Sequence, residues 1–276
     1  MRLKTSEAFS SQGISTPEPF QRLVNQGLIL GEDNQKMSKS RGNVVNPDDV
    51  VAEYGADSLR LYEMFMGPLE QVKPWQMKGV EGVYRFLGRV WRLVMESNQD
   101  EEWKLSAQLQ DVPVDKKLNK IIHETIKKVG EDIEKLSFNT SISQMMVLTN
   151  AFTQSEVRPA SGVMTLLQVL NPFAPHITEE LAKIIGSAFP SLKKNGLLVH
   201  QPWPEFDPAA LIESEVEVIL QVNGKLRDRL TVPLNAPKED LEKLAMANAK
   251  MAEFTAGLTV RKIIVVPNKL VNIVAN

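Results

Sequence analysis

Two lysines, Lys36 and Lys39, lie in a segment rich in small and polar residues, Lys36-Met37-Ser38-Lys39-Ser40-Arg41-Gly42-Asn43. Ammonium groups and backbone amides are charge-assisted donors to phosphate oxygens, and a glycine such as Gly42 lets the backbone approach a ligand closely. The pattern is typical of a flexible loop that could bind a polyphosphate. On charge pattern alone, the plainer interpretation of a solvated basic turn is favoured.

The composition argues against several other kinds of site. The 276 residues contain no cysteine, which excludes disulfides and thiolate metal sites. His123, His176 and His200 are widely separated, so we predict no protein-bound metal. The net charge of −2 gives no global attraction to nucleic acid, so any RNA contact must come from local basic patches. No apolar run of about 18 residues is present, so no transmembrane helix or membrane partner is expected.

The residues around the lysines must be positioned by two blocks of different pattern. Residues 1–74 are rich in Gly, Asn, Asp and Pro, which predicts loops around short helices at 19–27, 47–54 and 56–66. Asn46 and Pro47 are a typical N-cap and first helical residue. In residues 75–205, apolar side chains recur at helical spacing. We predict an antiparallel bundle there, almost wholly helical up to residue 189. Its helices are expected at 80–95, 115–136, 139–152, 160–170 and 178–185.

A Pro-rich linker at 190–211 leads into a third block, residues 212–276, with the alternation of a β-sheet. Strands are predicted at 215–222 and 226–232, joined by Asn223-Gly224, because both turn residues tolerate positive φ. Leu226, Leu230 and Val232 are expected on one face, with Arg227 and Arg229 on the other. A helix at 237–254 and strands at 260–266 and 270–275 complete a small ββαββ domain of the α+β class. The fold predicted for the whole chain is mostly α and multidomain.

The segment Lys36-Met37-Ser38-Lys39-Ser40 resembles the KMSKS signature of class I aminoacyl-tRNA synthetases. Residues 41–47 (RGNVVNP) and 53–60 (EYGADSLR) are similar to the enzymes for leucine, isoleucine, valine and methionine, and 62–68 (YEMFMGP) and 81–92 (EGVYRFLGRVWR) favour the leucine enzyme. Residues 132–140 (DIEKLSFNT) and 172–181 (PFAPHITEEL) resemble the anticodon-binding helical domain. Residues 222–227 (VNGKLR) and 265–274 (VVPNKLVNIV) resemble the C-terminal domain of bacterial and organellar leucyl-tRNA synthetases.

The resemblance implies a loop that closes over ATP while the carboxylate of leucine attacks the α-phosphate. Lys36 and Lys39 would be catalytic, neutralising the charge on the departing pyrophosphate, with Lys39 the more important. One such donor is typically worth about 3–4 kcal/mol at the transition state. The ATP-binding residues would be Lys36, Met37, Ser38, Lys39 and Ser40, with Asn43 anchoring the exit of the loop. ATP, with Mg²⁺, is expected as a substrate.

The other implied partners are leucine and tRNA(Leu). In the family the C-terminal domain reaches the elbow of tRNA, which implies phosphate contacts by Lys225, Arg227, Arg229, Arg261, Lys262 and Lys269. A solvated surface of mixed charge is the alternative interpretation of these residues. A cytoplasmic location is expected. A chloroplast or mitochondrion is the alternative, because residues 1–16 are Ser/Thr-rich like a transit peptide.

The sequence departs from the family in one respect that bears on activity. It contains no His-x-Gly-His motif and no large editing insertion. In the family, that motif belongs to the N-terminal Rossmann half. Because that half binds most of ATP and leucine, we expect no leucyl-adenylate from this chain alone. It would be a truncated product, a splice form, or one half of a split enzyme with a separate N-terminal half. A non-catalytic module that binds tRNA or structured RNA is the alternative function. An isoleucyl- or valyl-type relative is a further one, against which the ββαββ tail argues.

Overall fold

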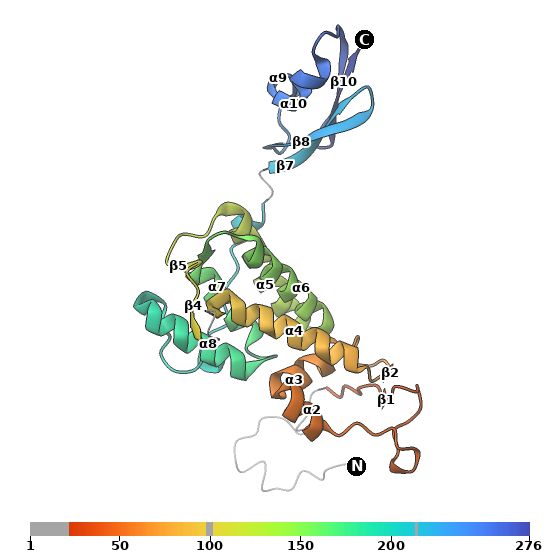
Figure 1. Ribbon diagram of the computed structural model, residues 1–276, viewed down its shortest axis with the longest axis vertical. Helices are drawn as coiled ribbons and strands as arrows, with labels where there is room; N and C mark the ends of the chain where they lie inside the picture. Colours follow the sequence, from red (N-terminus) through yellow and green to blue (C-terminus); the bar gives the residue numbers. More distant parts are fainter. Residues whose placement is uncertain (1–21, 98–101, 213–214) are drawn as a thin grey trace. The chain divides into compact units, whose positions relative to one another are not determined.

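A computed structural model describes residues 22–97, 102–212 and 215–276. The chain is mostly helical with small sheets, and it divides into two compact units after Ala210 (Figure 1). The first unit contains the Lys36–Asn43 segment and the helical bundle. The second contains the C-terminal sheet and its helices.

The first unit begins with short elements that frame the lysine segment. Strand β1 (Ile29–Leu30) pairs in parallel with β2 (Lys73–Pro74), and helices α2 (Pro47–Tyr54) and α3 (Ala56–Phe65) lie between them in sequence. As predicted, Asn46 caps α2: its side chain accepts a hydrogen bond from the Asp48 amide at 3.2 Å. Gly55, at φ 87°, separates α2 from α3.

The helix predicted at 19–27 is wrong over its described part. From residue 22 onward the segment has no regular structure, and the Leu23 side chain is 82% exposed. Gly27 instead donates a backbone hydrogen bond to the Leu69 carbonyl at 2.9 Å. It packs so closely that a Cβ there would lie 2.1 Å from the Gln71 oxygen. This long-range pairing replaces the local helical bonds, a tertiary effect that periodicity cannot reveal. Residues 19–21 lie outside the described residues.

The bundle consists of α4 (Met77–Val94), α5 (Lys116–Glu134), α6 (Phe138–Gln154), α7 (Ala160–Leu170) and α8 (Pro175–Ala188). Helices α4, α5, α6 and α8 each bury one apolar stripe, as the spacing predicts, whereas α7 is buried on almost every side. The capping of α5 by Asp115 is also as predicted. The largest side chains in the core include Phe86, Phe152 and Phe173.

The prediction that this region is almost wholly helical missed short strands. An antiparallel pair is formed by β3 (Met95–Ser97) and β4 (Trp103–Leu105), and a parallel pair by β5 (Leu109–Gln110) and β6 (Arg158–Pro159). The buried guanidinium of Arg158 donates to the carbonyl oxygens of Arg92 at 2.9 Å and Phe152 at 3.3 Å. It donates to carbonyl oxygens at the C-terminal ends of α4 and α6, where the Phe152 carbonyl also accepts from the Ser155 amide at 3.2 Å. These acceptors explain why an arginine is buried here.

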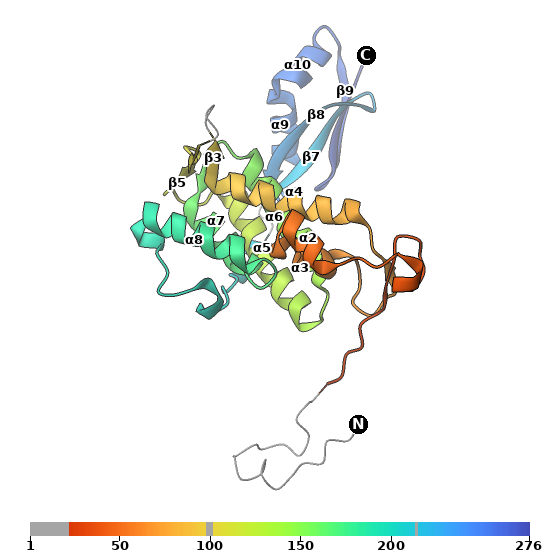
Figure 2. The same ribbon diagram turned by 60° about the horizontal axis from the view of Figure 1, so that its bottom comes forward.

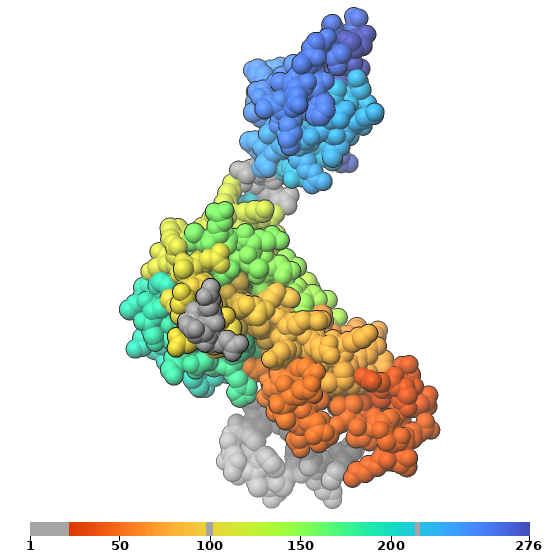
Figure 3. Space-filling model, viewed as in Figure 1, coloured from red at the N-terminus to blue at the C-terminus, as the bar shows by residue number. Residues whose placement is uncertain are grey.

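The segments predicted as 1–74 and 75–205 share one hydrophobic core. Val50 of α2 and Leu61 of α3 pack in the same cluster as Val80 and Val83 of α4. Figure 3 shows the orange residues of α2 and α3 packed against the amber residues of α4. Residue 74 is therefore not a break in packing, so the bundle supports the lysine segment directly.

Much of the predicted linker at 190–211 packs on the bundle. It contains the short 3-10 turns η2 (Pro190–Leu192), η3 (Leu198–His200) and η4 (Pro208–Leu211), and Leu198 is buried in the core. The Asp207 amide donates to Nδ1 of His123 on α5 at 2.9 Å. Trp203 lies against Gly130, where the missing side chain leaves room for the indole.

The second unit is a four-stranded sheet in the order β8-β7-β10-β9, in which β7 and β10 are parallel and the other pairs antiparallel. Its elements are β7 (Glu215–Val222), β8 (Lys225–Pro233), α9 (Lys238–Ala247), α10 (Ala249–Thr255), β9 (Val260–Val266) and β10 (Leu270–Ala275). Figure 2 shows α9 and α10 together on one face of the sheet. The turn between β7 and β8 has φ 49° at Asn223 and 76° at Gly224, the geometry that this dipeptide predicts.

Two predictions for this unit need correction. The single helix at 237–254 is two helices, because Asn248 is extended and caps α10 through the Met251 amide at 3.1 Å. The face assigned to Leu226 is also wrong. The pairing of β7 with β8 shifts between Leu220 and Gln221, and Leu226 is 55% exposed. Beyond such a bulge, the side chains that would face the core face solvent instead, and the pattern of apolar and polar residues does not indicate the bulge.

Gly79 in α4 offers a test of the packing between α3 and the bundle. A Cβ at Gly79 would lie 2.3 Å from Cε2 of the buried Tyr62 ring, whereas one at Gly82 meets nothing within 4 Å. We expect Gly79→Ala to destabilise the first unit by about 1–3 kcal/mol through overpacking. Gly82→Ala, the matched control, should be neutral or stabilising by up to about 1 kcal/mol. Denaturant unfolding followed by circular dichroism measures both, and equal stability of the two variants would contradict the packing described.

Candidate functional site

The lysine segment forms a closed loop between β1 and α2, at the edge of the first unit (Figure 2). A bridge between Leu30 and Lys36 closes its base, and the Gly31 amide donates to the Gln35 carbonyl at 2.9 Å. The 3-10 turn η1 (Lys39–Arg41) follows and ends at Gly42, whose φ of 69° favours glycine. The loop therefore has a defined backbone that brings Lys36 and Lys39 onto one short stretch.

The side chain of Asn43 holds this backbone together. Its oxygen accepts a hydrogen bond from the Ser38 amide at 2.9 Å. Its amide nitrogen donates to the Asp33 carboxylate at 3.1 Å and to the Lys36 carbonyl at 3.4 Å. These bonds connect Asn43, at the end of the loop, to Asp33 near its start and to Lys36 and Ser38, the residues on both sides of Met37. The expected anchoring role of Asn43 is therefore visible in the geometry.

The side chains predicted to bind ATP differ in their surroundings. Lys36 and Lys39 are exposed, and neither forms an ion pair with any residue that the structure describes. The Ser38 and Ser40 hydroxyls lie 3.2 Å apart, and Met37 packs partly buried against the core of the unit. Met37 thus secures the loop to the bundle, while both ammonium groups face solvent and remain available to an anion.

Sequence reasoning missed Asp33, which the loop geometry now brings into the site. The Asn43 amide, followed by the Gln35 backbone N–H, holds the pKa of the Asp33 carboxyl below its usual value of 3.8. Because the pKa of Asp33 is lowered in the folded protein, its hydrogen bond from Asn43 is fully present at neutral pH. The stabilisation is lost only as the pH falls through the folded-state pKa. Asn34, at φ 59°, makes the turn that places Asp33. An Asp-Asn pair before a basic loop is a turn signal that could have indicated it.

The structure does not bring the predicted RNA-binding cations together in one patch. By strand register, Arg229 lies in the middle of β8, level with Leu270 at the start of β10. Lys225 lies at the start of β8, and Lys262 pairs with Val274 near the end of β10. Some have partners: Arg229 pairs with Glu217 at 3.0 Å, Arg227 lies 4.0 Å over the Phe254 ring, and Arg261 donates to Asn276 at 2.8 Å. Lys225, Lys262 and Lys269 are exposed without an ion pair among the described residues. These lysines are the cations best placed to contact phosphate.

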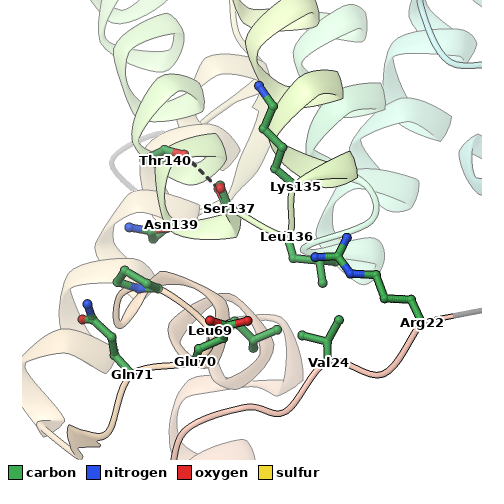
Figure 4. Close-up of a pocket in the computed structure, with 11 residues that line it drawn as sticks. Arg22, Val24, Leu69, Glu70, Gln71, Lys135, Leu136, Ser137, Asn139 and Thr140 are labelled. Atoms are coloured by element: carbon green, nitrogen blue, oxygen red, sulfur yellow. Dashed lines mark hydrogen bonds between the residues drawn. The ribbon is translucent and has the colours of Figure 1, made fainter.

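A separate pocket of about 410 Å³ lies where the N-terminal segment meets the bundle (Figure 4). Arg22 and Val24 enter it from the extended segment, and Leu69–Gln71 enter it from the loop after α3. Lys135–Ser137 come from the turn between α5 and α6, and Asn139 and Thr140 come from the first turn of α6. Lys36 and Lys39 do not line this pocket. It is therefore distinct from the loop.

Neither a metal site nor a membrane segment is found in the described part of the chain. No group of three or more His, Asp or Glu side chains there could hold a metal ion. Within the same residues, no helix is both long enough and apolar enough to cross a bilayer.

Comparison with known proteins gives two family matches and a similar solved structure. Residues 4–73 match the class I tRNA synthetases for I, L, M and V, and residues 115–243 match the anticodon-binding domain of tRNA ligases. The second match extends past the structural division at Ala210. The chain is similar to the agnB2 LeuRS of Agrobacterium radiobacter K84, solved in a ternary complex with tRNA and LeuAMS. The two are 29% identical with a TM-score of 0.62, over 98% of this chain and 35% of that one. This chain thus spans about a third of that protein's length.

The role of Asn43 can be tested without any activity assay. Asn43→Ala removes the acceptor of the Ser38 amide, so hydrogen exchange at that amide should accelerate by about 2- to 10-fold. The pKa of Asp33 should also rise toward 3.8, which a carboxyl NMR titration measures. Ser40→Ala removes only the hydroxyl contact and should leave both values unchanged. Unaltered exchange at Ser38 in Asn43→Ala would show that the side chain does not hold the loop.

Proposed function

Because this chain belongs to the class I tRNA synthetases and resembles part of a leucyl-tRNA synthetase, we propose that it serves the ATP-dependent ligation of leucine to tRNA(Leu). It would contribute the lysines that meet the departing pyrophosphate, together with the units that hold tRNA. The observation that carries this proposal is the loop itself, in which two exposed ammonium groups lie on a backbone pinned by Asn43.

The proposed chemistry requires charge to be neutralised as it develops. The carboxylate of leucine attacks the α-phosphate of ATP, the bond to the bridging β-oxygen breaks, and pyrophosphate leaves with its negative charge. Lys36 and Lys39 have no carboxylate partner among the described residues, so their charges can meet the leaving oxygens without first breaking an ion pair. ATP enters as its Mg²⁺ complex and is a substrate.

The remainder of the active site would come from a nucleotide-binding half. Several apolar side chains around the loop are exposed, and they would bury apolar surface against such a half. These are Leu23, Leu28, Ile29, Val44, Val51 and Val72. Adenine, ribose and the leucine side chain would be positioned there, so we expect no adenylate formation by this chain alone.

The first test is pyrophosphate exchange with leucine, ATP and labelled pyrophosphate. The chain is mixed with a separately expressed N-terminal half of a leucyl-tRNA synthetase. We expect exchange only when both parts are present, and Lys39→Ala should reduce it by about 10²- to 10³-fold, because a transition-state donor is lost. Replacing Lys36 as well should reduce it further.

Lys243→Ala is the matched control, because Lys243 is an exposed lysine on α9 in the other unit. It should leave exchange unchanged. Full exchange after replacement of both Lys36 and Lys39 would refute the role assigned to the loop.

A non-catalytic module that binds tRNA is the second candidate function, and the exposed C-terminal lysines favour it. We expect tRNA(Leu) binding to weaken with salt, because phosphate contacts release counterions. Lys262→Ala should lower the slope of log affinity against log salt by about 1. Arg229→Ala should lower it less, since Glu217 already neutralises that guanidinium at 3.0 Å. Equal slopes for both variants and the unchanged chain would remove these residues from the interface.

The two candidate functions are separated by comparing the two assays. Salt-sensitive tRNA binding without pyrophosphate exchange in the reassembled pair would favour the binding module.

A further inference from the structure

Helix α4 begins without a cap from its own residues. Its N-cap residue, Gln76, makes no capping hydrogen bond with its side chain, and its first turn contains no acidic residue. The first amides of a helix need acceptors from elsewhere, and the helix dipole favours a negatively charged one. Glu32, in the loop, supplies it: its Oε1 accepts a hydrogen bond from the Met77 amide at 3.1 Å. The two residues are 45 positions apart, so the loop caps the first helix of the bundle.

The start of α4 is itself held by buried side chains. The Gln76 amide donates to the hydroxyl of Tyr62 on α3 at 2.8 Å. The rings of Tyr62 and Trp75, both buried, meet edge to face with centroids 4.9 Å apart. The Trp75 indole donates to the sulfur of Met77 at 3.1 Å. This end of α4 is therefore a fixed point to which the exposed loop can be joined.

Glu32 lies between two residues that shape the base of the loop. Before it, a Cβ at the buried Gly31 would lie 2.7 Å from Oδ1 of Asp33 and 2.9 Å from Nδ2 of Asn43. After it, Asp33 accepts a hydrogen bond from Asn43 at 3.1 Å. The two adjacent carboxylates thus have different partners: Glu32 contacts α4, whereas Asp33 contacts the far end of the loop.

These contacts form one continuous path between α4 and the lysines. It runs from the Met77 amide to Glu32, along the backbone to Asp33, and through Asn43 to the Ser38 amide and the Lys36 carbonyl. We propose that Glu32 is a positioning residue, which holds the loop in place against the start of α4. This inference rests on the proposed function, because the position of the ammonium groups affects the rate only if they meet the departing pyrophosphate.

The position of the loop would act on the chemical step rather than on the binding of leucine. Misplacing a reacting group by about 1 Å can cost about 10²-fold in rate. Leucine would be bound by the nucleotide-binding half, so the KM for leucine should not depend on Glu32. A loss of kcat at constant KM for leucine is therefore the expected signature of this residue.

The first measurement needs no activity and uses the full chain. Hydrogen exchange is followed at the Met77 amide, which Glu32 contacts, and at the Ser38 amide, which it does not. Glu32→Ala should accelerate exchange by about 2- to 10-fold at Met77 and by about 2-fold or more at Ser38. Glu32→Gln keeps an acceptor oxygen and should restore most of the protection at both. Acceleration at Met77 alone would overturn the proposed path.

The second measurement is pyrophosphate exchange in the reassembled pair. Glu32→Ala should lower kcat by about 3- to 30-fold at unchanged KM for leucine, and Glu32→Gln should recover most of that loss. Asn43→Ala acts on the same path, so the double variant should lose less than the product of the two single losses. Full kcat in Glu32→Ala, or single losses that simply multiply, would contradict the positioning role.

Glu81→Ala is the matched control. Glu81 is an exposed carboxylate on α4 whose side chain accepts no hydrogen bond from a described residue. Its replacement should leave both measurements unchanged, and circular dichroism checks that every variant is folded. Absence of exchange in the unmutated pair would refute the proposed function, whereas hydrogen exchange would still decide whether Glu32 holds the loop.

Discussion

The arrangement of the first unit depends on one buried carboxylate. Helix α8 begins at Pro175 after Ala174, and neither residue has a side chain that can cap it. Asp57 on α3 supplies the cap from across the interface, accepting from the His176 and Ile177 amides. Such a cap is typically worth about 0.5–2 kcal/mol, and the positive end of the helix favours the carboxylate charge. Because α3 follows α2 and the loop, the same contact fixes the loop-bearing segment to the bundle.

Local signals in the sequence were sufficient wherever neighbouring residues decide the structure. Asn46 and Pro47 predicted the start of α2, and Asn223-Gly224 predicted the hairpin turn. The errors share a physical cause, which is that distant residues determine the outcome. Gly27 pairs with Leu69 instead of forming a helix, and a bulge between β7 and β8 displaces Leu226 from the core. Neither event leaves a trace in the local pattern of apolar and polar residues.

The candidate site, like the fold, was predicted only in part. Residue type alone favoured a solvated basic turn, and the resemblance to the KMSKS signature both singled out the lysines of the loop and suggested their role. The geometry adds why the loop holds its shape, through Asn43 and the unforeseen Asp33. For the C-terminal cations, residue type was not sufficient. Their types suggested a phosphate-binding surface, but Glu217 and Phe254 engage two of them, and the strand register spreads the others over the sheet.

The unpaired lysines of the loop have a consequence for its empty state. Both ammonium groups are exposed, and neither is held in an ion pair by a described residue. A polyanion that binds there would displace water and counterions but would break no ion pair within the protein. The free energy of its new contacts would therefore not be offset by the loss of an existing charge pair. Dissolved ions screen charges over about 8 Å at physiological ionic strength, so they would weaken this attraction even without competing for the lysines.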